Sequence, residues 1–108
     1  MVKEKRKVLR EAIAFYGKEH QILKAIEEMS ELTKELAIAL EETTKGRGVD
    51  NNLTNKIISE LADVEITIEQ IEMMFLCTQK KEQVKREKID RLKKQIAKDK
   101  EIKFSAYK

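Results

Sequence analysis

Two short segments of the chain place acidic residues three positions apart among apolar ones. AIEEMSEL carries Glu28 and Glu31, and SELADVEI carries Glu60 and Asp63. Residues three apart share one face of a helix, because each residue turns by about 100°. Four carboxylates that meet would repel one another, and a divalent cation removes that repulsion. Because the donors are all oxygen atoms, with no Cys or His among them, they favour Mg²⁺, or Mn²⁺, over zinc.

The same spacing also arises by chance, because 20 of the 108 residues are acidic. A second row on the same stretch of chain, Glu65, Glu69 and Glu72, follows positions i, i+4 and i+7. Periodicity does not choose between this row and the pair Glu60 and Asp63. From the residues alone, the acid pairs therefore have two interpretations, a solvated helix surface or a set of ligands for a hard metal ion.

Helices must position these acids, because apolar residues recur at three- and four-residue steps along most of the chain. There is no Pro, and only 3 Gly and 5% aromatic residues, which favours long helices over strands. The pattern predicts four helices, over about residues 3–16, 19–42, 53–78 and 80–102, and leaves open whether the last two are continuous. The segment TTKGRGVDNN predicts a loop between the second and third helices. An antiparallel hairpin of these two helices brings their acidic flanks together.

The predicted fold is all-α, a four-helix bundle-like domain built on this hairpin and covering residues 1–108. A core this narrow leaves apolar surface over, so we expect a homo-oligomer, a homodimer or a homotetramer. No apolar run approaches the roughly 20 residues that cross a bilayer. The charged N-terminal residues lack the apolar region of a secretory signal, and the single cysteine, Cys77, offers no disulfide framework. We therefore expect no membrane contact and a cytoplasmic protein.

Charge is distributed unevenly along the chain. Residues 1–78 hold 11 basic and 15 acidic residues, a net charge of −4, whereas residues 79–108 hold 12 basic and 5 acidic residues, a net charge of +7. An acidic body with a basic last helix suits a ligand that brings both metal and phosphate. The same distribution is also typical of a solvated helix with a Lys-rich face.

The order of the acidic residues resembles the MazG-like family of all-α nucleoside triphosphate pyrophosphohydrolases. The signature of that family is E-E-x-x-E, a spacer, and E-x-x-D. In this chain the two halves read Glu27, Glu28 and Glu31, then Glu60 and Asp63. The later segment REKIDRLKKQI is similar to the basic segment that often closes these domains.

The resemblance implies a role for each matching residue. It makes Glu28, Glu31, Glu60 and Asp63 the ligands of Mg²⁺. Glu27 is expected to orient water, and Glu27, Glu28 and Glu31 form the expected catalytic set. The expected contacts to substrate come from Gln21, Lys24, Lys88 and Arg91. The implied reaction cleaves an NTP or dNTP between its α- and β-phosphates, giving a nucleoside monophosphate and pyrophosphate, as in nucleotide-pool cleansing.

A different class of function is a non-catalytic helical interaction module whose basic last helix binds nucleic acid or an acidic partner. Its basic residues are not interleaved with aromatic ones, so binding of nucleic acid is not expected. A ferritin-like di-iron site is excluded, because it needs Glu-x-x-His pairs and the chain has one histidine. That histidine, His20, is interpreted as a solvent-facing residue at a helix start, and Cys77 as a packing residue.

Overall fold

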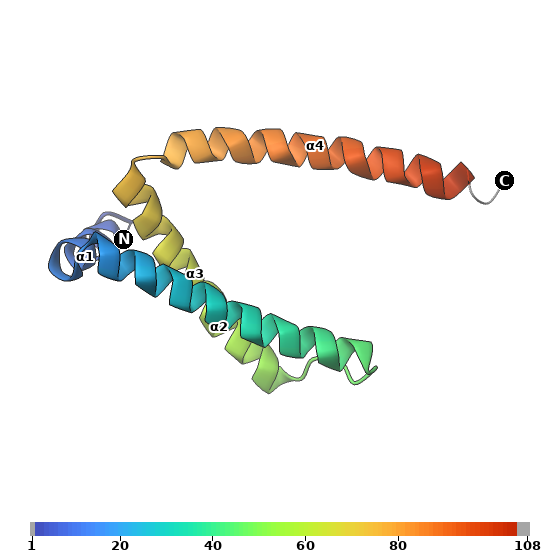
Figure 1. The fold of residues 1–108 in the computed structure, drawn as a ribbon, viewed down its shortest axis with the longest axis horizontal. Coiled ribbons are helices and arrows are strands. Elements are labelled where there is room, and N and C mark those ends of the chain that lie inside the picture. The colour runs from blue at the N-terminus through green and yellow to red at the C-terminus, as the bar shows by residue number, and fades with distance from the viewer. Residues whose placement is uncertain (1, 106–108) are drawn as a thin grey trace. The chain divides into compact units, whose positions relative to one another are not determined.

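The computed structural model describes residues 2–105 and contains four helices (Figure 1). They are α1 (Val2–Tyr16), α2 (Lys18–Thr44), α3 (Asn51–Phe75) and α4 (Thr78–Ser105). The described part of the chain has no strand, which confirms the all-α prediction. The helix bounds lie within three residues of the predicted ones, and α3 and α4 are separate helices.

Local backbone features explain where the helices begin and end. Gly17, between α1 and α2, has φ 91°, a conformation that L side chains rarely adopt. Asp50 caps α3, because its carboxylate accepts a hydrogen bond from the backbone N–H of Leu53 at 2.8 Å. Leu76 ends α3 in the left-handed region at φ 50°, and its N–H donates to the carbonyl of Glu72.

The chain divides into two compact units, residues 1–76 and residues 77–108. The first unit contains α1, α2 and α3, and the second contains α4. The assignment of residues 1–108 to one bundle-like domain stays a prediction. No helix in residues 2–105 combines the length and the apolar character needed to cross a membrane.

Within the first unit, α2 and α3 lie side by side as an antiparallel hairpin, and α1 packs against both of them (Figure 1). The apolar core is small, with Ala25, Leu53 and Val64 as its buried members. Two buried glutamines add a polar link. Gln21 Nε2 donates to Gln70 Oε1 at 3.0 Å, and Gln70 Nε2 donates to the carbonyl of Leu9 at 3.3 Å. This network joins all three helices, since its members come from α2, α3 and α1.

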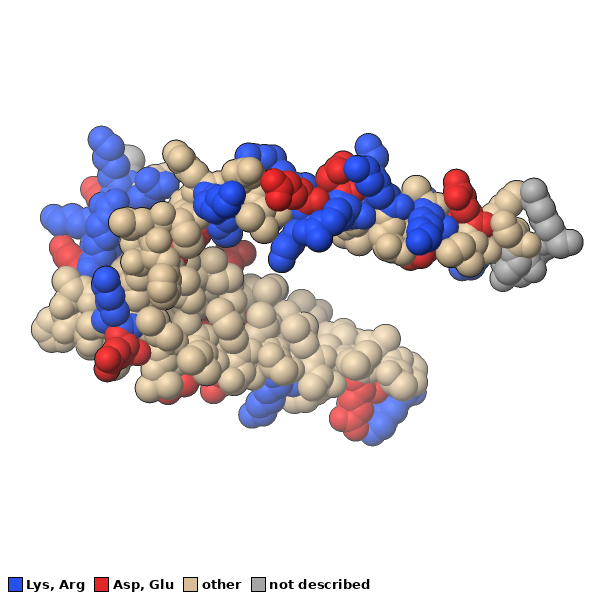
Figure 2. All heavy atoms as spheres, turned by 45° about the horizontal axis from the view of Figure 1, so that its top comes forward, with Lys and Arg blue, Asp and Glu red and all other residues tan. Residues whose placement is uncertain are grey.

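Most of the apolar stripe predicted for the core of a bundle lies outside the core of this unit. Six of its side chains are between 37% and 68% exposed, and we call them the apolar face: Ile26, Met29, Leu36 and Leu40 of α2, and Leu61 and Ile68 of α3. The reason is that α2 contacts α3 through the flank that carries Gln21 and Ala25. This flank lies about a quarter turn around α2 from the apolar stripe. On α2 and on α3, the residues of the apolar face are rotated away from the helix contact in the same sense. In an antiparallel hairpin they therefore lie on the same side. Figure 2 shows a broad uncharged surface on this unit.

Candidate metal centre

Three of the four predicted metal ligands come together on the hairpin. One carboxylate oxygen from each of Glu28, Glu60 and Asp63 lies within 4.8 Å of the other two. Within residues 2–105, this is the one group of three or more acidic, His or Cys side chains placed to hold a metal ion. The geometry therefore groups one acid of α2 with two of α3, as an antiparallel pairing of the two half-motifs requires.

The buried positions of the hairpin explain this convergence. Ala25 is 1% exposed, and Glu28 follows it by one helical turn on the same flank of α2. Val64 is 8% exposed, and Glu60 precedes it by one turn on α3. The small side chain of Ala25 lets the two helices approach closely. Glu28 and Glu60 are consequently held partly buried between the helices.

The surroundings of Glu60 disfavour its charged form. Burial raises the pKa of Glu60, and the negative charges of Glu31, Glu28, Asp63 and Glu35 raise it further, in that order of effect. The Oε2 atoms of Glu60 and Glu35 are buried and accept no hydrogen bond from any described residue. Buried carboxylate oxygens ordinarily have such partners. A buried carboxylate oxygen without such a partner, within a group of carboxylates, fits a hard cation such as Mg²⁺.

The remaining predicted acids lie around the group of three. Glu31 is exposed and is not in that group, yet its charge acts on Glu60. Glu27 is exposed and points about 100° away from Glu28 on the helix. Glu35 also acts on Glu60, and the sequence prediction assigned it no role. The sequence does indicate such a role for Glu35, because this residue follows Glu28 by seven positions and so lies on the same flank of α2.

The structure also locates the competing acidic row on α3. Glu65 and Glu69 are exposed and, with Lys5, line a hollow between α1 and α3 that has an apolar floor of Val8, Leu9 and Ile66. Neither belongs to the group that surrounds Glu60. Glu65 and Asp63 point to nearly opposite sides of the helix, because two residues turn it by about 200°. The geometry thus favours Asp63 over this row as a metal ligand.

The two predicted substrate contacts on α2 differ in their surroundings. Lys24 Nζ lies 3.5 Å from Glu28 Oε1, and its side chain is 51% exposed. Because half of the Lys24 side chain is exposed, an anionic ligand can approach it beside the acidic cluster. Gln21 is buried, and both ends of its amide have hydrogen-bond partners, His20 and Gln70. Gln21 as a contact to substrate stays a prediction.

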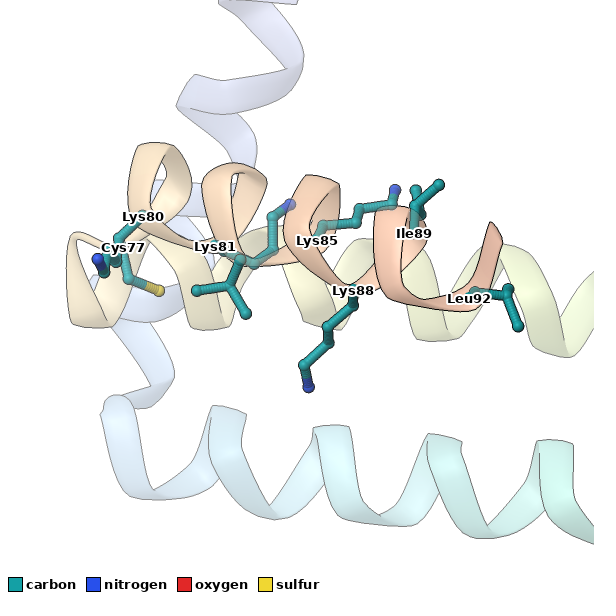
Figure 3. A pocket seen from close by; sticks show the side chains of 8 residues that line it. Cys77, Lys80, Lys81, Lys85, Lys88, Ile89 and Leu92 are labelled. Atoms are coloured by element: carbon teal, nitrogen blue, oxygen red, sulfur yellow. The ribbon is translucent and has the colours of Figure 1, made fainter. Parts of the chain in front are cut away.

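The other two predicted substrate contacts, Lys88 and Arg91, are exposed on α4. They lie three residues apart and therefore share a face of this helix. The first half of α4 has a shallow groove that is lined by lysines, including Lys85 and Lys88, and by apolar side chains, including Ile89 and Leu92 (Figure 3). Figure 2 shows basic side chains along α4 with a few acidic ones among them. Residues 78–105 hold 11 basic and 5 acidic residues, a net charge of +6.

Comparison of the chain with protein-family models, with curated proteins and with solved structures finds no match. A function for this protein therefore has to be inferred from its own residues and from the geometry that joins Glu28, Glu60 and Asp63.

Proposed function

We propose that the protein is an Mg²⁺-dependent nucleotide pyrophosphohydrolase of the MazG-like type. The observation that carries the proposal is the convergence of Glu28, Glu60 and Asp63 within 4.8 Å. Two features support it, the unpartnered buried oxygen of Glu60 and the adjacent charge of Glu31. These residues occupy the ligand positions of the two half-motifs, and they fit Mg²⁺ or Mn²⁺ by the chemistry of their donors.

Different residues of the cluster and its surroundings have different roles in the proposed reaction. Glu28, Glu60 and Asp63 would hold the ion, with Glu31 beside them. When bound, the ion supplies charge neutralisation for phosphate oxygens and lowers the pKa of a water molecule. Glu27 is exposed and directly precedes Glu28 on α2, and the proposal gives it the task of orienting that water and accepting its proton. Lys24 can bind a phosphate at the edge of the cluster, because its Nζ already lies beside Glu28.

The basic helix α4 has a part in the same proposal. A triphosphate carries several negative charges, and α4 has a net charge of +6 with Lys88 and Arg91 exposed on one face. Arginine binds a phosphate through two parallel hydrogen bonds, and lysine binds it as a point charge. Lys88 and Arg91 are the side chains of α4 that we assign to the phosphates.

A second copy of the chain completes the proposed assembly by covering the apolar face. Six large apolar side chains on one side of a two-helix hairpin cannot be buried by that hairpin itself. Two identical faces of this kind can pack against each other about a twofold axis and form a four-helix core. A homodimer of this kind would bury the apolar face, and a homotetramer would add a second interface.

The test is pyrophosphate release from a panel of NTPs and dNTPs in the presence of Mg²⁺. Replacing Asp63 by Asn should reduce release by more than about tenfold, because even residues behind metal ligands contribute 10- to 100-fold. The matched variant Glu65→Gln removes a charge two residues away, outside the cluster, and should leave release unchanged. Activity kept in Asp63→Asn and lost in Glu65→Gln would reverse the assignment of the two acidic rows.

The same panel separates the enzyme from the interaction module. If the wild-type protein releases no pyrophosphate from any nucleotide and calorimetry detects no binding of Mg²⁺ or Mn²⁺, the metal-dependent enzyme is wrong. Salt-sensitive binding of DNA by the same preparation would then favour a module that acts through α4.

A further inference from the structure

An exposed group of aromatic rings lies at the junction of α1 and α2, and the proposed reaction does not use it. The rings of Tyr16 and His20 are stacked, with centroids 5.0 Å apart and planes inclined by 19°. Phe15 packs edge-on against Tyr16 at 4.9 Å. Phe15 is 82% exposed and Tyr16 is 56% exposed, although aromatic side chains usually bury most of their area. We call Phe15, Tyr16 and His20 the aromatic platform.

The platform is held in place by the fold. Gly17 has φ 91°, and this turn ends α1 and begins α2 so that Tyr16 stacks on a ring four residues later. His20 Nδ1 and Gln21 Oε1 are hydrogen-bonded at 2.7 Å, and Gln21 is itself fixed by Gln70. The orientation of the exposed His20 ring is therefore set by the buried network that joins the three helices.

The platform and the candidate metal centre lie along one row of α2. His20, Lys24 and Glu28 follow each other at steps of four residues, so their side chains point in similar directions. Eight residues of helix separate His20 from Glu28 by about 12 Å along the axis. Lys24 lies between them and is 3.5 Å from Glu28. The order along this row is aromatic, cationic and anionic, which matches the order of base, phosphate and metal in a metal-bound nucleotide.

We propose that the aromatic platform binds the base of the nucleotide whose phosphates lie at the acidic cluster. This inference rests on the proposed function, which supplies the nucleotide. The base stacks on the open surface of the Tyr16 and His20 pair. Stacking accepts every base, because each has a π-face. Purines present a larger face than pyrimidines, so purine nucleoside triphosphates are the substrates that the platform favours.

The experiment compares two ligands by titration calorimetry in Mg²⁺. One is α,β-methylene-ATP, whose α–β linkage cannot be hydrolysed, and the other is inorganic tripolyphosphate, which has no base. Replacing Tyr16 by Ala should weaken binding of the nucleotide at least about fivefold, the lower end of the loss measured for base stacking, and leave binding of tripolyphosphate unchanged. Tyr16→Phe keeps the ring and should bind both ligands as the wild type does. The α,β-methylene analogue of CTP should bind the wild type more weakly than that of ATP.

The outcomes separate this inference from the proposed function. If wild type and Tyr16→Ala bind the nucleotide equally, the platform does not bind the base. If Tyr16→Ala loses both ligands to the same extent, Tyr16 has a structural role and the inference is wrong. If the wild type binds neither ligand in Mg²⁺, the proposed function itself fails.

Discussion

Replacing Leu36 by Gln is expected to weaken the pairing of two copies while the helical fold is kept. Leu36 lies in the middle of the apolar face and is 48% exposed in the single chain. About half of its surface therefore remains for a second copy to cover. Glutamine has a similar helix propensity to leucine, so the substitution changes the surface of α2 more than its stability.

The size of the effect follows from that exposed fraction. Complete burial of a leucine side chain contributes about 1.5–3 kcal/mol, so covering half of Leu36 contributes roughly 0.7–1.5 kcal/mol. A twofold interface contains the residue twice, which makes the loss about 1.5–3 kcal/mol per dimer. The dissociation constant of the dimer should rise by roughly 10- to 150-fold.

Sedimentation equilibrium over a range of protein concentrations measures this change directly, and circular dichroism checks that the helices persist. The control is Lys34→Gln, which introduces the same side chain at an exposed position of α2 outside the apolar face. It should leave the dissociation constant unchanged. A wild-type protein that stays monomeric at high concentration, or a Leu36→Gln variant that pairs as tightly as the wild type, would refute the role given to the apolar face.

Three further predictions concern the stability of the first unit. Without divalent cations, stability should fall as the pH rises above 4.5. The pKa of Glu60 is raised in the folded protein, so the folded protein binds a proton more tightly than the unfolded chain does. The contribution of Glu60 to stability is complete below pH 4.5 and is lost as the pH rises through the raised pKa. Mg²⁺ should flatten this slope, as urea unfolding at several pH values would show. Replacing Asp50 by Ala removes the cap of α3 and should cost about 1 kcal/mol in the same assay, whereas Asn should retain most of the cap. Replacing Gln70 by Leu leaves the buried Nε2 of Gln21 without its acceptor and should cost about 1–3 kcal/mol, and adding Gln21→Leu should restore part of that loss.

The four helices were predicted from periodicity, because each helix has an apolar stripe with a clear repeat. The loop between α2 and α3 was predicted from its glycines and its other turn-forming residues, and the structure shows that Asp50 caps the next helix. The face through which α2 meets α3 was not readable. α2 has an apolar stripe and, a quarter turn away, a flank of Gln21, Ala25 and acids. Periodicity locates both surfaces, but it does not decide which one is used within a chain and which one is left for a partner.

The acidic residues of the candidate site were predicted from the sequence, but spacing did not decide which of them belong together. Spacing alone left Asp63 and the row of Glu65 and Glu69 equally acceptable, and the resemblance favoured Asp63. The structure separates them because Glu65 points away from Glu60 on α3. For Gln21 the resemblance implied contact with substrate, which stays a prediction, and the structure shows its amide hydrogen-bonded to Gln70 and His20. A polar residue beside a motif reads the same in sequence whether it faces a ligand or another helix.

The hairpin of α2 and α3 has an acidic side and an apolar side. Glu31 and Asp63 are offset from the α2–α3 contact in one rotational sense, and Leu36 and Leu61 in the other, so acids and apolar side chains lie on opposite sides. An acidic contact between helices is a poor way to hold a hairpin together, because its like charges repel and its oxygens lack donors. The proposed cation at the acids and the proposed second copy at the apolar face would offset this cost. Metal uptake and pairing should therefore each stabilise the hairpin independently, and their effects on its free energy of unfolding should add.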